Sequence, residues 1–311
     1  MKTATRHLGL VFGTISLLAL AACGQDEDVA QAPAPAEAET PAAAEPDAPR
    51  ELTQEEKNAA RFDEILAGAW REDKNKARDG FRNPKETLTF FGLQPDMTVV
   101  EVWPGGGWYA DVIAPFVKED GKYYAAGFDP ASDNERIVKA IAAFQTKYIN
   151  DADTFGNVTA TVFGPNVGDI APAGSADMVL TFRNVHNWVP RGYAEEGFVQ
   201  MYRALKPGGI LGVVDHRLPA DVEADADLTS GYIHEQAVID LAEKAGFVLD
   251  GSSDINNNPK DTADHPFGVW TLPPVLRSAP RGEPADEAFD QTKYKEIGES
   301  DRFTLRFKKP E

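Results

Sequence analysis

Residues 99–116 read "VVEVWPGGGWYADVIAPF", and this stretch decides the fold class. A β-branched run meets three glycines and then a segment with helical spacing of apolar residues, which predicts a buried parallel strand, a tight turn and a helix. A turn of this kind can present backbone N–H groups to a ligand at a helix N-terminus. A simple β–α turn gives the same pattern, and Trp103 occupies the place where ligand-binding loops usually carry their first glycine.

The same strand–turn–helix rhythm continues on both sides of this stretch. Thr53 and Glu56 have the spacing of a capping box, and Pro84 and Gly92 mark the start and end of a second helix. Expected strands then cover residues 122–129, 157–164, 176–185, 210–217, 247–253 and 302–310, and expected helices cover 107–121, 134–149, 194–209 and 233–246. Such alternation predicts an α/β fold with a doubly wound, mostly parallel sheet.

The N-terminal 50 residues have a different composition. Lys2 and Arg6 precede an apolar run at 8–20, which predicts a signal peptide over residues 1–22, in preference to an anchor helix. "LAAC" (residues 20–23) resembles a bacterial lipobox, so Cys23 is the expected lipidation site. Residues 23–50 are rich in Ala, Pro and Glu and predict a disordered tether to a domain over 51–311. Gly24 favours export to the periplasmic face of an outer membrane.

Charge and cysteine content exclude several classes of function. The chain has 31 Lys and Arg against 50 Asp and Glu, a formal charge of −19, so no nucleic-acid partner is expected and the membrane is reached only through the lipid on Cys23. Cys23 is the single cysteine, which excludes disulfides and catalysis by a thiol. A small-molecule substrate is the expected partner, and the oligomeric state is not predicted.

The motifs "VVEVWPGGG" and "LKPGG", in this order of elements, resemble the class I S-adenosylmethionine-dependent methyltransferases. With "FRNVHNW" and "NNNPKDTADHPFGVWTLPP", the body is similar to a family of bacterial predicted methyltransferases, lipoprotein-like and of unknown substrate. The resemblance implies a seven-stranded, Rossmann-like sheet with an antiparallel last strand, and S-adenosyl-L-methionine as cofactor. The cofactor contacts that it implies are Glu101, Pro104, Gly105, Gly106, Gly107, Asp129 and Asn184.

Two cofactor contacts of the family, those to the ribose and to the adenine, lack their usual acidic residue in this chain. The carboxylate for the ribose hydroxyls is expected at the end of the second strand, where this chain has Gly127, and Asp129 is the nearest acidic residue. Asp129 either serves from a displaced turn or only starts a turn with Pro130. The third expected strand has no acidic residue directly after it to hold the adenine amino group.

Histidines follow two neighbouring strands of the expected sheet. His186 or His216 is a candidate general base, and Asp215 is a candidate for fixing a histidine tautomer. The alternative is a polar network that only supports the loops. The sequence does not choose between the two histidines.

Residues 254–300 break the rhythm and predict an insertion, with a lid or substrate wall in its first half and a solvated excursion in its second. The substrate-pocket residues expected are Trp188, Arg217, Asn256, Asn258 and Lys260. Residues 254–265 begin with the ligand spacing of an EF-hand loop, but Pro259 and His265 replace its glycine and glutamate, so no metal site is predicted.

Two functions follow from these observations. One is an exported methyltransferase acting on a small molecule or an envelope component. The alternative is a binding module that keeps the methyltransferase fold without activity and recognises a periplasmic ligand. A dehydrogenase is less favoured, because "GGGWYA" lacks the third glycine of the dinucleotide fingerprint.

Overall fold

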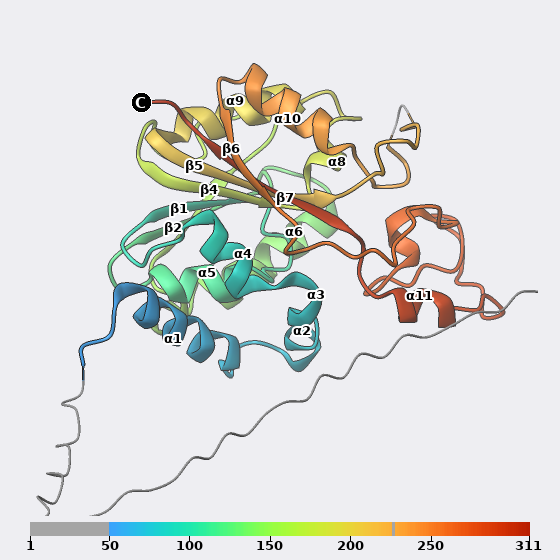
Figure 1. Cartoon of the computed structure of the whole chain (residues 1–311), viewed down its shortest axis with the longest axis horizontal. Coiled ribbons are helices and arrows are strands. Elements are labelled where there is room, and N and C mark those ends of the chain that lie inside the picture. Colours follow the sequence, from blue (N-terminus) through green and yellow to red (C-terminus); the bar gives the residue numbers. More distant parts are fainter. Residues whose placement is uncertain (1–49, 226–227) are drawn as a thin grey trace, which may run out of the picture. The chain divides into compact units, whose positions relative to one another are not determined.

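Seven strands form one sheet in the order β3-β2-β1-β4-β5-β7-β6 (Figure 1). The computed structural model describes residues 50–225 and 228–311, so the expected signal peptide, Cys23 and nearly all of the tether lie outside the described residues. The strands are β1 Thr98–Val102, β2 Lys122–Gly127, β3 Val158–Val162, β4 Ala176–Phe182, β5 Leu205–His216, β6 Val248–Ser253 and β7 Arg302–Lys308. Strand β7 pairs antiparallel with both β5 and β6, and the other pairs are parallel. The predicted α/β fold with an antiparallel last strand is confirmed.

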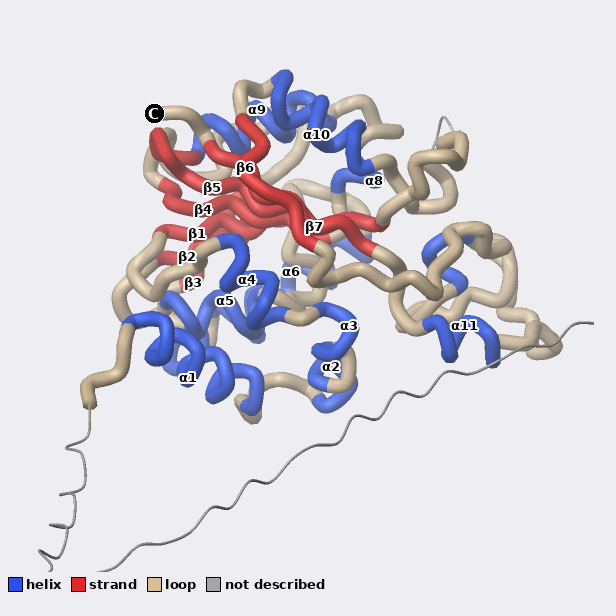
Figure 2. Tube along the Cα trace, in the orientation of Figure 1, coloured by secondary structure: helices blue, strands red, loops and turns tan. Residues whose placement is uncertain are grey.

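Helices cover both faces of this sheet (Figure 2). On one face lie α1 Gln54–Ala67, α4 Pro84–Phe91, α5 Ala110–Val117 and α7 Ala152–Phe155, and on the other lie α8 Val185–Trp188, α9 Ala194–Ala204 and α10 Glu235–Lys244. The remaining elements are α2 Asp73–Lys76, α3 Asp79–Arg82, α6 Glu135–Phe144, the π-helix η1 Gln145–Ile149, the 3₁₀ helix η2 Gly268–Thr271 and α11 Thr292–Ile297. None of the helices in the described ranges is both long and apolar enough to span a membrane.

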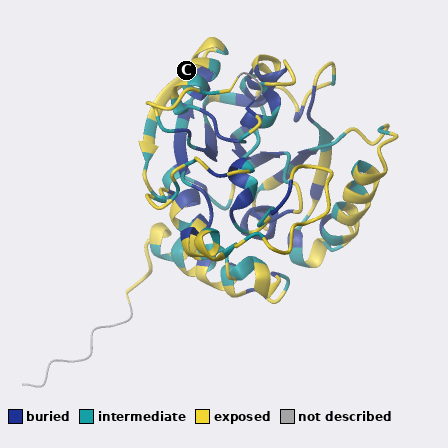
Figure 3. Ribbon diagram, turned by 90° about the vertical axis from the view of Figure 1, so that its right-hand side faces the viewer, coloured by how far each residue is buried: buried dark blue, intermediate teal, exposed yellow. Residues whose placement is uncertain are grey.

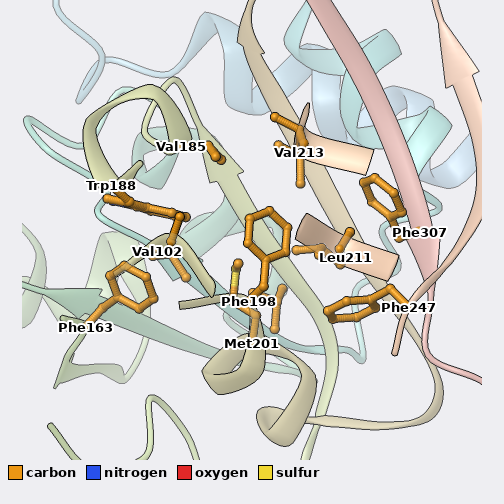
Figure 4. Close-up of a cluster of buried hydrophobic side chains, with 14 of the residues drawn as sticks. Val102, Phe163, Val185, Trp188, Phe198, Met201, Leu211, Val213, Phe247 and Phe307 are labelled. Atoms are coloured by element: carbon orange, nitrogen blue, oxygen red, sulfur yellow. The ribbon is translucent and has the colours of Figure 1, made fainter. Parts of the chain in front are cut away.

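Each face of the sheet has its own hydrophobic core. Figure 4 shows one of them, where Phe198 and Met201 of α9 pack against Leu211 and Val213 of β5. On the opposite face, Phe62 of α1 and its neighbours on α4 and α5 form the second core. The central strands are therefore buried on both sides (Figure 3), which explains why they read as continuous apolar runs in the sequence.

The local signals at the helix ends are mostly confirmed, with one correction. Thr53 and Glu56 form both hydrogen bonds of the capping box, and Gly92 ends α4 in a left-handed conformation. The helix expected over 194–209, however, ends at Ala204, and the following "LKPGG" belongs to β5. Pro207 cannot continue a helix, and Gly208 and Gly209 instead exchange backbone hydrogen bonds with Lys309 next to β7.

The topology brings distant segments to one edge of the sheet. The parallel strands all end there, and the antiparallel β7 begins there, since Arg302 pairs with His216 at the end of β5. The segment between β6 and β7 folds beside the same edge and contains η2 and α11. Ligands bind at this edge in open α/β sheets.

Candidate functional site

A cavity of about 420 Å³ lies at the carboxyl ends of β1, β4 and β5. We call it the strand-end cavity. Its walls come from the loop after β1, from the residues after β4, from α3, from the segment around η2 and from the start of β7. Of the predicted cofactor and catalytic residues, it is lined by Glu101, Pro104, Gly105, Gly106, Asn184, His186 and His216.

Trp103 takes the backbone conformation for which glycine is normally needed. Its φ is +51°, in the left-handed region, and its backbone N–H donates to Ala126 O at 2.8 Å. The indole Nε1–H donates to Phe163 O at 3.2 Å, and the ring packs against Phe128, Trp188 and Phe163. Aromatic packing and two hydrogen bonds thus offset the strain of a side chain at this position.

The three glycines after Trp103 have different roles. Gly105 has a φ of +58° and open space where a Cβ would point, and Gly106 is open as well, so both let a ligand approach the backbone. Gly107, predicted as a cofactor contact, instead makes room for Tyr148, because a Cβ there would lie 2.0 Å from its hydroxyl oxygen. The Tyr148 hydroxyl donates to Gly107 O at 2.9 Å, so this glycine is required by packing of the loop on η1.

Glu101 places a buried carboxyl group at the cavity. The residue is 2% exposed, and the Tyr123 hydroxyl donates to its Oε2 at 2.5 Å. Burial raises the pKa of Glu101 to about 7, although this hydrogen bond acts in the opposite direction. A carboxyl group with such a pKa is poised to accept a cationic ligand group, which would favour its ionised form.

Asn184 connects the end of β4 to the glycine loop. Its Nδ2 donates to Val102 O at 3.0 Å and to Thr181 Oγ1 at 3.1 Å. The residue therefore holds the two loops together while its side chain lines the cavity.

A second cavity, of about 280 Å³, shares Trp103, Pro104 and Gly105 with the strand-end cavity. It is mostly apolar and is lined by residues of β2, α6 and β3, including Phe128, Phe144 and Ala160. Asp129, predicted to hold the ribose, lines neither cavity; it is exposed, and its Oδ1 accepts a hydrogen bond from Ala131 N at 2.8 Å. This agrees with the simpler of the two roles considered for Asp129, because its carboxylate closes the turn that contains Pro130.

His186 and Asp215 form a buried pair at the ends of β4 and β5. The distance from His186 Nδ1 to Asp215 Oδ1 is 2.7 Å, and Asn187 Nδ2 lies 2.9 Å from His186 Nε2. Since an amide NH₂ can only donate, Nε2 is the acceptor and Nδ1 carries the proton towards Asp215. This places the basic nitrogen of His186 on Nε2, with Asp215 fixing the tautomer as predicted for one of the two histidines.

The surroundings of His216 disfavour its protonated form. Its Nδ1 lies 2.5 Å from Ser300 Oγ. Burial, together with nearby His186 and the arginines of the cavity, holds the pKa of His216 well below its usual range. His216 therefore stays neutral, and the structure favours His186 as a proton acceptor.

Ligand atoms of His186, Asp215 and His216 lie within 4.8 Å of one another, a cluster that could hold a metal ion and that the sequence analysis did not predict. Four arginines line the same cavity, and their charge opposes a divalent cation. The geometry therefore favours the proton-transfer role of this cluster.

The five predicted substrate residues do not line the strand-end cavity. Trp188 is fully buried in a hydrophobic core, and Arg217 forms ion pairs with Glu235 and Asp301. Asn256 donates to Thr87 and Thr304 inside the fold, Asn258 donates to Ile297 O and Glu299 O, and Lys260 is exposed near Glu296. Asn256 thus ties the insertion to α4 and β7, and Asn258 joins the two ends of the insertion, so both have structural partners within the fold.

The insertion contributes to the cavity through other residues. Val269, Trp270, Pro273 and Pro274 line the cavity, and so do Glu299 and Ser300. Residues 280–288 are exposed, in line with the predicted solvated excursion. The lid role stays a prediction.

Four arginines of the cavity were missed by the sequence analysis: Arg78, Arg82, Arg183 and Arg302. Two signals were present in the sequence. Arg183 directly follows a buried strand, and Arg78 and Arg82 have the i, i+4 spacing of one helical face. The antiparallel last strand was expected, but which of its residues reach the cavity, Arg302 among them, depends on its register with β5.

The fold and the glycine loop together define the class I methyltransferase fold. No protein-family model matches the chain, and no curated protein matches its sequence. A SAM-dependent methyltransferase from Aquifex aeolicus is similar in structure, at 18% identity and a TM-score of 0.48, over 77% of this chain and 100% of that one.

Two further structures are similar to a comparable degree. The [4+2]-cyclase SpnF has 15% identity and a TM-score of 0.49, over 83% of this chain and 94% of its own. The geranyl diphosphate C-methyltransferase of Streptomyces coelicolor A3(2), solved with Mg²⁺, geranyl diphosphate and S-adenosyl-L-homocysteine, has 12% identity and a TM-score of 0.49, over 73% and 77%. At such identities the likeness concerns the fold alone.

Proposed function

We propose that this protein is an S-adenosylmethionine-dependent methyltransferase acting on a small molecule. The observation that carries the proposal is the open, left-handed Gly105 beside the buried carboxyl group of Glu101, at the edge where this fold binds its ligand. S-adenosylmethionine, when bound, supplies an electrophilic methyl group on a sulfonium.

The chain offers matching groups for such a cofactor. Glu101 can accept hydrogen bonds from an ammonium group, and Gly105 and Gly106 allow close backbone approach. The apolar second cavity, which Gly105 also lines, suits an adenine ring, with Phe128 and Phe144 in its wall. Asp129 and Gly107 are not part of this set.

The chemistry left to the chain is alignment and proton removal. His186 Nε2 accepts the proton of a hydroxyl or amine nucleophile, and Asp215 stabilises the resulting imidazolium across 2.7 Å. Asn187, which now donates to Nε2, must turn aside when a nucleophile takes its place.

Calorimetric titration of the full chain with S-adenosylhomocysteine tests the cofactor. We expect saturable binding that Gly105→Val abolishes, because the new side chain fills the space beside the loop and strains its left-handed backbone. Gly174→Val is the matched control: Gly174 also has a positive φ (+65°) and open space, but lies before β4, outside both cavities.

Absence of binding by the wild-type protein would contradict the methyltransferase proposal and would favour the cofactor-free binding module. Equal loss of binding in both glycine variants would show general destabilisation, and thermal unfolding of each variant separates that case.

We further propose that the chain is exported and anchored through a lipid on Cys23. The support is the order of Lys2, Arg6, the apolar run and "LAAC" in the sequence. Cells expressing the protein and fed labelled palmitate should label it, and Cys23→Ala should remove the label and release the protein from membranes. Labelling that persists in Cys23→Ala, or none in the wild type, would contradict the anchor.

A further inference from the structure

An excess of positive charge lines the strand-end cavity, although the chain as a whole carries −19. Four arginines and two glutamates line this cavity, so 4 − 2 = 2 positive charges remain even when both carboxyl groups are ionised. Buried charges are normally paired, because transfer out of water without a partner is costly.

Glu299 compensates for only part of this charge. Its carboxylate contacts Arg78 and Arg302, and it accepts from Arg82 Nε at 2.9 Å. Burial alone would raise the pKa of Glu299, but Arg302, Arg82, Arg183 and Arg78 together hold it well below its usual range. One carboxylate therefore forms ion pairs with three guanidinium groups.

Arg183 has no such partner. Arg183 is half-buried and lines the cavity, and within residues 50–225 and 228–311 its side chain makes no hydrogen bond or ion pair. Burial, together with Arg302, lowers the pKa of Arg183 to about 10, which leaves it cationic at neutral pH. Its φ is +62°, so the backbone is also held in a conformation that costs free energy for a side chain of this size.

Arg82 points to the same conclusion. It is 4% exposed and stacks on Trp108, yet its Nη1 is buried without an acceptor. An unsatisfied buried donor and an unpaired cation in one cavity indicate a ligand that accepts hydrogen bonds and carries negative charge.

The cofactor is not the anion that this cavity lacks. S-adenosylmethionine carries two positive groups and one carboxylate, so its binding would add charge of the same sign. Arg302 also lies at the start of β7, three strands from β1 in the sheet order, which is about 14 Å at the usual strand spacing. The unmatched charge therefore extends from the glycine loop to the far side of the cavity.

We propose that the strand-end cavity binds a substrate bearing a carboxylate or phosphate group, held by Arg183 and Arg82. This inference names the substrate class and rests on the proposed methyltransferase function. The anion would sit beside the His186–Asp215 pair, which fixes the nucleophile of the same molecule relative to the base.

Inorganic phosphate and acetate serve as probes for titration of the full chain at low ionic strength, with and without S-adenosylhomocysteine. We expect saturable binding of at least one anion, weakened at least about tenfold in Arg183→Gln, since a charge-assisted hydrogen bond contributes that much. Affinity for S-adenosylhomocysteine should stay within about twofold. Arg183→Lys, which keeps the charge, should retain most of the anion binding.

Arg203→Gln is the matched control, because Arg203 is exposed on α9, pairs with Asp169 and lies outside the cavity. It should bind both probes as the wild type does. Thermal unfolding checks that Arg183→Gln folds; its midpoint should equal or exceed that of the wild type, since an unpaired cation is removed.

Three results would overturn the inference: no saturable binding of either anion by the wild type, unchanged binding in Arg183→Gln, or a tenfold loss of S-adenosylhomocysteine affinity in that variant. The last would assign Arg183 to the carboxylate of the cofactor. Anion binding that depends on Arg183, without any binding of S-adenosylhomocysteine, would refute the methyltransferase and leave the anion site standing.

Discussion

Single residues at this site adopt states that cost free energy. Trp103 and Arg183 have left-handed backbones without being glycine, Glu101 is a buried carboxyl group, and Arg183 is an unpaired cation. Such costs are typical of functional positions, where the surrounding structure holds a residue in an unfavourable state for the sake of a ligand. Trp103, Arg183 and Glu101 all line the strand-end cavity, which strengthens its assignment as the site.

Glu101 should make stability depend on pH. Burial raises its pKa to about 7 in the folded state from 4.5, so the folded state binds the extra proton between these values. The stabilising contribution is complete below pH 4.5 and is lost as pH rises through 7. Glu101→Gln has no proton to lose, so its free energy of unfolding relative to wild type should increase by about 2 kcal/mol from pH 5 to pH 8.

Urea unfolding of both proteins at the two pH values measures this difference, in which the other titrating groups cancel. A difference that is the same at pH 5 and pH 8 would mean that Glu101 is already ionised in the folded state at pH 5.

At the scale of elements, the function depends on where strands end. His186 follows β4 and Asp215 is near the end of β5, and parallel pairing of these strands brings the two side chains into contact. Asn184, two residues before His186, donates to Val102 O at the end of β1, and this hydrogen bond holds the glycine loop next to the His186–Asp215 pair. Loops that are far apart in the sequence therefore form one site at the edge of a rigid sheet.

The tautomer of His186 follows from this contact and can be measured directly. We expect the ¹⁵N chemical shifts of His186 to report a proton on Nδ1, and Asp215→Asn to weaken that preference, since the amide can present a donor in place of the carboxylate. Once a methyl-accepting substrate is known, His186→Gln should lower the single-turnover rate of methyl transfer by a factor of about 10² to 10⁴.

His234→Gln is the control for this measurement, because His234 precedes α10 and lies outside the cavity. A proton found on Nε2 of His186, or an unchanged rate in His186→Gln, would remove His186 from the role of base.

For the whole molecule, the antiparallel course of β7 has the largest consequence. This course pairs Arg302 with His216, and it brings Glu299 and Ser300, at the end of the insertion, into the lining of the same cavity. A parallel last strand would begin at the opposite edge and leave the cavity without these groups. The positive cavity in an acidic protein is thus a product of topology, which brings four of the 31 Lys and Arg residues to one place where an anion can be bound.

The sequence by itself determined the alternating elements, the sheet class and the glycine loop, because strand and helix periodicity and turn residues act over short distances. It also predicted His186 and Asp215, from polar residues near the ends of expected strands, and Glu101, from the resemblance to the methyltransferase motif; their roles stay predictions. It misplaced Asp129, Gly107 and the asparagines of the insertion, whose partners Ala131, Tyr148, Thr304 and Glu299 depend on turn geometry and long-range packing.

Only the tertiary structure decided which histidine has the carboxylate and which arginines surround the cavity. Residues 82, 183 and 302 are far apart in the chain, and their meeting follows from strand order and from the direction of β7. Their charge matters because they meet in one cavity, where Arg82 and Arg302 are buried and Arg183 is half-buried, and removal from water makes an unpaired charge costly. Local patterns in a sequence contain no record of that proximity.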